Sequence, residues 1–168
     1  MSIRVSDVIH GLATQQVNGL IIVLKKAKKY CEETGTDYAT LSSARLQPDM
    51  FPLAWQLNAT LEILVRGAAR LSHAQLIGLS LHEDETDFDG LIARIEGLRQ
   101  HVLGIDSAVL DQSANEKINA PFGAMPMTGK EFVLTSILPN FYFHLTTSYD
   151  LFRMSGVAVG KNDYLGKS

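Results

Sequence analysis

Polar side chains recur at steps of four, four and three residues along an otherwise apolar segment, residues 128–156: Ser136, Asn140, His144 and Thr147. Residues spaced in this way share one face of a helix. Because the segment is apolar on nearly every side, we predict a buried helix with this polar face turned inward. Buried polar groups cost free energy unless they are paired. The face is therefore either a satisfied core network or a ligand site.

A second set of polar side chains flanks the second predicted helix, which begins after an N-cap at Asp49 and ends at about Ser72. Asp49, Gln56 and Thr60 lie at steps of seven and four, beside an apolar seam of leucines. Ligand sites in helix bundles are built by side chains that project inward from facing helices. We expect these three residues to be able to reach a site that contains His144.

An acidic segment gives a near match to a calcium-binding loop. Its residues would fill positions one, three, five, six and twelve of that loop, but position one is a glutamate and no second copy exists to pair with it. The apolar period of a helix also continues through the segment. We interpret it instead as the acidic start of a helix capped by Thr86. The matching residues are Glu85, Asp87, Asp89, Gly90 and Glu96.

Other catalytic motifs are absent or incomplete. Cys31 has no histidine within a helical turn to act as its base. Gly160 and Lys161 fit a phosphate loop poorly, because the flanking positions have the wrong residues and follow a helix. The histidines other than His144 are expected at the surface or at its boundary.

The composition is that of one ordinary globular domain, residues 1–168. The chain is 46% hydrophobic and 20% charged, with a net charge of −3. No basic face is large enough for nucleic acid, and no apolar run has the length of a signal peptide or of a membrane span. The single cysteine excludes an intrachain disulfide, and a reducing cytoplasm is the expected location.

Helical periodicity predicts an all-α fold with four helices. Helix one begins at Val5 and ends at Gly35, and helix two follows an expected N-cap at Asp49. Helix four begins at a capping box formed by Thr128 and Glu131, and Pro139 should bend it. Helix two should have Pro52 in its first turn and run to about Ser72. The other predicted elements are helix three at 87–110, a short hairpin or flap at 115–129, and a tail at 157–168 that lies back across the bundle.

Several of these segments together resemble a branch of unknown function in the DinB/YfiT-like superfamily. They are PDMFPLAWQ at the start of helix two, LPNFYFH in helix four with the Tyr, Arg and Gly that follow it, and the GKNDYLG tail. The resemblance covers nearly the whole chain. It implies an up-down-down-up four-helix bundle, often assembled as a homodimer.

The resemblance also implies a metal site whose ligands are only partly present here. In metal-binding members, a helix-two histidine and an H-x-x-x-H pair on helix four hold a divalent ion such as Zn, Ni or Mn, and some members transfer thiol cofactors to small electrophiles. Here His144 matches the second histidine of the pair, Asn140 replaces the first, and Gln56 takes the approximate place of the third. Without metal, His144 would act as general base or polariser, with Gln56, Asn140 and Tyr142 or Tyr149 orienting a small-molecule ligand.

Two classes of function follow from these residues. One is a ligand-binding or transferase-like enzyme pocket around His144. The other is a non-catalytic dimeric structural or interaction protein, in which the buried polar residues only fix the packing register.

Overall fold

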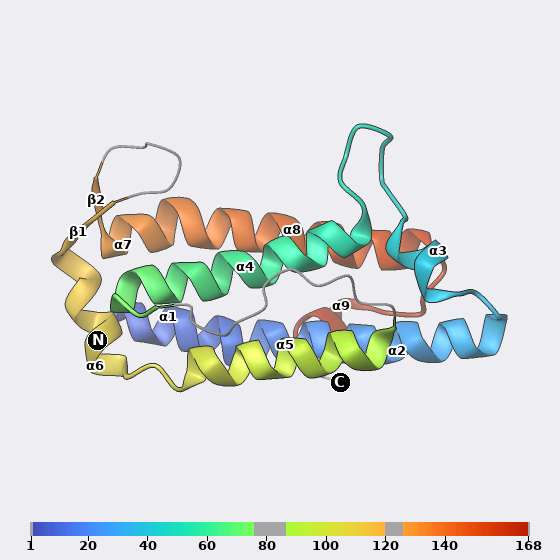
Figure 1. The fold of residues 1–168 in the computed structure, drawn as a ribbon, viewed down its shortest axis with the longest axis horizontal. Coiled ribbons are helices and arrows are strands. Elements are labelled where there is room, and N and C mark those ends of the chain that lie inside the picture. Colours follow the sequence, from blue (N-terminus) through green and yellow to red (C-terminus); the bar gives the residue numbers. More distant parts are fainter. Residues whose placement is uncertain (1, 76–86, 120–125, 168) are drawn as a thin grey trace.

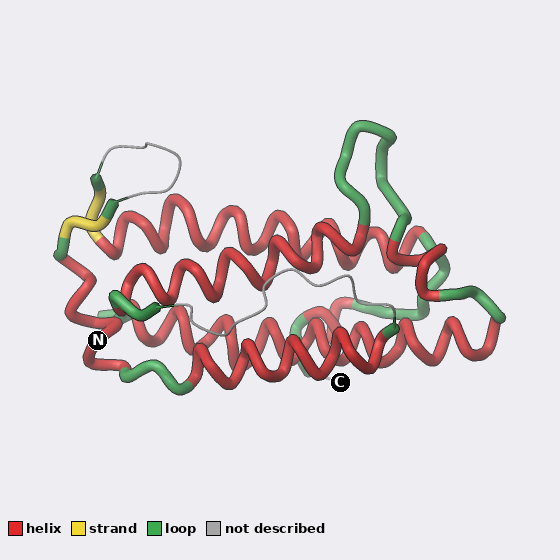
Figure 2. Tube along the Cα trace, viewed as in Figure 1, coloured by secondary structure: helices red, strands yellow, loops and turns green. Residues whose placement is uncertain are grey.

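The computed structural model describes residues 2–75, 87–119 and 126–167, and most of them are helical (Figures 1 and 2). A two-stranded antiparallel hairpin pairs Lys117 with Thr128 and Ile118 with Met127. The all-α prediction with a small hairpin before the last long helix is therefore confirmed. The elements are α1 (Val5–Gly11), α2 (Val17–Thr34), α3 (Tyr38–Ser42), α4 (Leu53–Ser72), α5 (Phe88–Leu103), α6 (Ser107–Gln112), β1 (Lys117–Ile118), β2 (Met127–Thr128), α7 (Gly129–Phe132), α8 (Leu138–Met154) and α9 (Lys161–Tyr164).

The long helices run side by side along the longest axis of the molecule (Figure 1). In that view α1 and α2 run from left to right, α4 and α5 both return from right to left, and α8 runs from left to right. Within the described residues α4 packs most extensively on α8, and α5 packs on α2 and α4. These directions are the ones expected for an up-down-down-up arrangement, and they place α4 directly beside α8.

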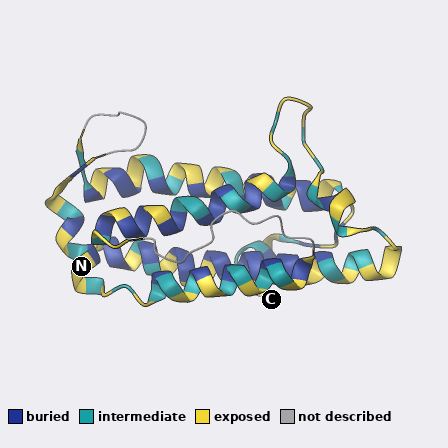
Figure 3. Cartoon of the chain, in the orientation of Figure 1, coloured by how far each residue is buried: buried dark blue, intermediate teal, exposed yellow. Residues whose placement is uncertain are grey.

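Helix one has the predicted bounds but is less regular than its apolar period predicts. It begins with α1, passes through a π-helical turn at Leu12–Gln16, and continues as α2 until Gly35, which ends it with a φ of 73°. Its buried face is apolar at nearly every step and lines the space between the helices (Figure 3). The left-handed conformation at Gly35 is one that glycine adopts without strain.

The start of helix four follows the predicted capping box. The Thr128 hydroxyl accepts a hydrogen bond from the backbone N–H of Glu131, and the Glu131 carboxylate accepts one from the Thr128 N–H. The helix then passes from α7 through a π-helical turn at Val133–Ile137 into α8. This wider turn directly precedes Pro139, which cannot donate a backbone hydrogen bond. The predicted irregularity is thus a π-helical turn next to the proline.

Two predicted boundaries are wrong for local reasons. Helix two begins after Pro52 and not after Asp49, which is exposed. Helix three ends at Leu103 and not at 110, because Asp106 accepts a hydrogen bond from the Ala108 N–H and starts the separate helix α6.

The C-terminal tail returns across the molecule, as predicted, and α9 packs against α2 (Figure 1). Asp163 is buried and accepts hydrogen bonds from Lys26 of α2 and from the Gly160 N–H at the start of α9. A Cβ atom at Gly19 would lie 2.9 Å from the Asp163 carbonyl oxygen and closer still to that of Tyr164. The tail can lie this close to α2 because residue 19 has no side chain.

None of the described helices combines the length and the apolar character needed to cross a bilayer.

Candidate functional site

The predicted site residues His144 and Gln56 meet where α8 lies against α4. The Nδ1 atom of His144 is 2.7 Å from the Oε1 atom of Gln56. Gln56 is 1% exposed, and its Nε2 atom donates a hydrogen bond of 3.2 Å to the carbonyl oxygen of Phe51. The buried amide is therefore paired at both ends, once to the other helix and once to the segment that precedes its own helix.

These two hydrogen bonds assign the tautomer of His144. Because the amide nitrogen of Gln56 donates to the Phe51 carbonyl, its oxygen is the atom that faces the imidazole. An amide oxygen can only accept, so Nδ1 of the neutral ring carries the proton and Nε2 keeps a lone pair. No described residue hydrogen-bonds to Nε2. The arrangement thus presents one hydrogen-bond acceptor of fixed orientation.

Aromatic rings surround this imidazole. The Trp55 ring lies edge-on to it at a centroid distance of 5.3 Å, and the Phe143 ring lies edge-on at 5.1 Å. Phe51 stacks on Trp55 at 4.1 Å with an angle of 15° between the planes. Phe51 and Phe143 are 54% and 57% exposed. The acceptor therefore lies beside apolar rings that are still open to solvent.

The surroundings of His144 favour its neutral form. Burial lowers the pKa of its imidazole, and no charged group contributes to this shift. The ring is therefore uncharged at neutral pH. A neutral imidazole can accept a proton or a hydrogen bond at Nε2, but it cannot attract an anion as an imidazolium would.

Asn140 does not take part in this site, and the prediction that its side chain points inward is wrong. It is exposed, and its amide nitrogen donates a 2.7 Å hydrogen bond to the backbone carbonyl oxygen of Ser136. Short amide side chains often bond to nearby backbone in this way instead of to a neighbouring helix. One helical turn therefore separates the exposed Asn140 from the cross-helix contact of His144.

Two further polar residues of helix four bond within their own helix. The buried Thr147 donates to the Phe143 carbonyl oxygen, and Ser148 donates to that of His144. Among the described residues, the predicted polar face of α8 is thus not a continuous network. His144 is the member of that face that bonds to another helix.

The two tyrosines proposed to orient a ligand lie elsewhere. Tyr149 packs edge-on against Tyr164 of the tail at 5.5 Å, and Tyr142 packs against Phe141. Burial, and secondarily Tyr164, raise the pKa of Tyr142. Within the described residues neither ring contacts His144. The structure therefore brings His144 and Gln56 together but does not bring these tyrosines to them.

Sequence reasoning missed the aromatic residues of the site. Trp55 and Phe143 immediately precede the two polar residues, and Phe51 lies one helical turn before Trp55. Aromatic side chains next to candidate polar residues were a usable signal for a pocket wall. Of the other flanking residues, Thr60 is buried and donates to the Gln56 carbonyl oxygen, whereas Asp49 is exposed.

The acidic residues of the calcium-like segment are engaged in other contacts, and Glu85 and Thr86 lie outside the described residues. Asp87 is the N-cap of α5 and accepts from the Gly90 N–H at 2.8 Å. Asp89 binds Lys28, and Glu96 accepts from Arg99 and Gln100. The interpretation as an acidic helix start is supported, with Asp87 and not Thr86 as its cap.

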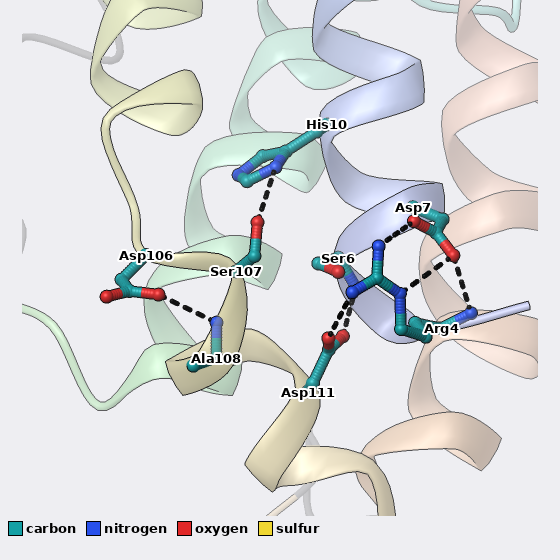
Figure 4. Close-up of polar contacts among 8 residues, drawn as sticks. All are labelled: Arg4, Ser6, Asp7, His10, Asp106, Ser107, Ala108 and Asp111. Atoms are coloured by element: carbon teal, nitrogen blue, oxygen red, sulfur yellow. Dashed lines mark hydrogen bonds and ion pairs between the residues drawn. The ribbon is translucent and has the colours of Figure 1, made fainter.

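A second polar cluster joins α1 to α6 and has a structural role (Figure 4). Asp111 accepts from the Ser6 N–H at 2.9 Å and forms an ion pair with Arg4, so it neutralises the start of helix one. In the same cluster, Nδ1 of His10 is 3.5 Å from the Ser107 hydroxyl. That distance is long for a nucleophile and its base, and no carboxylate of the described residues hydrogen-bonds to the imidazole. The cluster therefore does not form a catalytic triad.

The comparisons with known proteins agree with this fold. A profile described as a domain of unknown function, DUF1993, matches residues 6–165. A crystal structure of a DinB family member protein from Shewanella denitrificans superposes with a TM-score of 0.83 and is 31% identical, covering 94% of this chain and 88% of that one. A search of curated proteins finds no match.

The fold and the helix-four histidine thus define a DinB-like helical protein. Within that class, the chain belongs to the DUF1993 domain family.

The residues present do not fit the three-histidine metal site that the family resemblance implies. The Gln56 oxygen is already bonded to the His144 N–H, and the Asn140 amide is turned to its own helix. One imidazole nitrogen is left that could coordinate a metal ion. A single imidazole provides too few ligands for a zinc-like ion. Over residues 2–75, 87–119 and 126–167, no three histidine, cysteine or carboxylate side chains gather into a potential metal site. We therefore derive no reaction step through a metal.

Proposed function

We propose that this protein binds a small molecule at His144 and that the neutral imidazole accepts a proton or a hydrogen bond from it. The 2.7 Å contact between His144 and Gln56 carries this proposal, because it leaves Nε2 as the only unpaired ring nitrogen. Catalysis by this group would be general base chemistry. It would replace the metal-dependent thiol transfer known from related proteins.

The placement of the pair supports a site more than a core role. A polar pair that only fixes packing is expected to be enclosed on all sides, whereas His144 is half-buried beside the exposed rings of Phe51 and Phe143. Apolar walls with a few fixed polar groups are typical of small-molecule sites. The Gln56 contact restricts the imidazole to one orientation in advance of binding.

A fragment screen tests the proposal. The chain has a single tryptophan, Trp55, whose ring contacts His144, so its emission and its indole N–H resonance report on this site directly. We expect a subset of fragments to perturb both signals and to bind about threefold to tenfold more weakly to His144→Phe, which has no ring nitrogen, since a hydrogen bond contributes about 0.5–1.5 kcal/mol. Fragments that bind the variant equally well would contradict the proposal.

A second candidate function is a non-catalytic homodimer. It is favoured by the large apolar side chains that α8 and the turn before it expose, namely Leu134, Phe143 and Met154. If copies of the chain associate through the exposed ring of Phe143, Phe143→Ser should reduce the molar mass in light scattering. An unchanged mass would count against the dimer.

We also propose a cytoplasmic location. The single thiol, Cys31, is free and half-buried. Its pKa is raised, and burial is the largest cause of that shift. A free thiol of raised pKa is suited to a reducing compartment. Fractionation of cells that express the protein would test this location.

A further inference from the structure

We propose that the His144 site takes a neutral, planar aromatic molecule that carries one hydrogen-bond donor, such as a phenol or an indole. This inference rests on the proposed function and specifies the class of ligand. It follows from the shape of the rings, the direction of the acceptor and the absence of charge around it.

The rings form an apolar wall. Phe51 stacks face to face on Trp55, with 4.1 Å between the ring centroids, so Phe51 covers one face of the indole and is itself 54% exposed. Phe143 lies across the imidazole from α8 and is almost perpendicular to it, at 87°. Aromatic pairs prefer such offset-stacked and edge-to-face contacts. A planar aromatic ligand would extend this pattern by packing against the exposed surfaces of Phe51 and Phe143.

The polar group within this frame requires a donor from the ligand. Gln56 holds the proton of His144 on Nδ1, so Nε2 presents a lone pair. A ligand N–H or O–H can satisfy that lone pair, whereas an ether or a ketone brings a second acceptor and leaves both unpaired. An unpaired buried acceptor costs binding free energy.

The charge of the site favours an uncharged ligand. No charged side chain forms a hydrogen bond, an ion pair or a ring contact with His144 among the described residues, and burial alone accounts for the lowered pKa of the imidazole. A carboxylate would meet the lone pair of Nε2 and would lose its hydration without an opposite charge. A phenol or an indole keeps the donor and avoids this cost.

The test compares five para-substituted toluenes of similar shape. They are p-cresol, 4-methylanisole, p-xylene, p-toluate and 4-methylbenzylammonium. Binding to the full chain is followed through the indole N–H resonance of Trp55 and the imidazole nitrogen resonances of His144. His144→Phe removes the proposed acceptor, because phenylalanine has no ring nitrogen, and keeps a planar ring at this position. His73→Asn, at the exposed C-terminal end of α4, is the matched control.

We expect p-cresol to shift Nε2 of His144 and to bind about threefold to tenfold more tightly than 4-methylanisole or p-xylene, as one added hydrogen bond predicts. This difference should disappear in His144→Phe and persist in His73→Asn. Replacement of Phe143 by leucine should weaken p-cresol but keep the preference for a donor, because it removes only an aromatic wall.

The outcomes separate the two proposals. Tighter, His144-dependent binding of p-toluate or 4-methylbenzylammonium would overturn the ligand class and leave a small-molecule site in place. Binding that is unchanged in His144→Phe, or no binding of any of the five, would overturn the ligand class. The fragment screen would decide the proposed function separately. A Trp55 resonance that shifts with protein concentration and not with probe would assign the rings to an interface between copies and overturn the class as well.

Discussion

The Nδ1 atom of His144 lies 2.7 Å from Oε1 of Gln56 and joins α8 to α4 through a side chain that is almost completely buried. The same amide donates to the carbonyl oxygen of Phe51, so one residue fixes both the imidazole and the aromatic segment before α4. In a metal site the histidine nitrogens face an ion and outer groups orient them. Here Gln56 is the orienting group, and the outer face of the imidazole is left for a ligand.

The first prediction concerns the pKa of His144. An imidazolium quenches a neighbouring indole, so the emission of Trp55 should fall as His144 gains a proton. We expect the midpoint below the usual histidine value of about 6.5, because burial disfavours the charged ring. Gln56→Glu should move the midpoint upward, since a carboxylate beside Nδ1 stabilises the imidazolium.

The control for this titration is His73→Asn, which should leave the midpoint unchanged. A wild-type midpoint at or above 6.5 would show that His144 is not desolvated. A titration that persists in His144→Gln would assign the quenching to another group.

The second prediction concerns stability as a function of pH. The pKa of His144 is lower in the folded protein than in the unfolded chain, so the unfolded state binds the proton more readily. The contribution of His144 is therefore fully present above the unfolded pKa of about 6.5 and is lost as the pH falls toward the folded value. Urea titrations over this range should show wild type losing more free energy of unfolding than His144→Gln. Parallel curves for the two proteins would contradict the prediction.

The sequence was sufficient to predict the helices and the cap of helix four, because apolar spacing and the Thr128 to Glu131 capping box are local signals. It was also sufficient to predict that His144 reaches Gln56, since both belong to inward faces of neighbouring helices. The orientation of Asn140 was not predictable, because its amide can bond either to a facing helix or to the Ser136 carbonyl, and spacing does not distinguish these. The π-helical turn at Val133–Ile137 was not predictable either, although Pro139, two residues after it, indicated an irregularity in this part of the helix.

The third prediction tests the contact between the tail and helix one. Gly19→Ala should lower the free energy of unfolding by about 1–3 kcal/mol, because the new methyl group would overlap the Asp163 and Tyr164 carbonyl oxygens. Chemical denaturation measures this change. Gly97→Ala is the matched control, since its Cβ meets no atom within 4 Å and its helical position is exposed. It should stabilise by about 0.5–1 kcal/mol through helix propensity, and a similar effect of both substitutions would argue against a tight tail contact.

The last prediction concerns metal. Wild type offers one imidazole nitrogen at the site, so we expect no stoichiometric zinc to persist in competition with a chelating dye. The double variant Gln56→His with Asn140→His should gain stoichiometric zinc. Residues 140 and 144 are one helical turn apart on α8, and residue 56 of α4 faces His144. Each single variant provides two imidazoles and should bind more weakly than the double variant.

If wild type retained zinc, and lost it in His144→Gln, the metal-free interpretation of this site would be wrong. If the double variant folded but took up no zinc, the exposed position of residue 140 would be too far outward for even a histidine there to reach the ion.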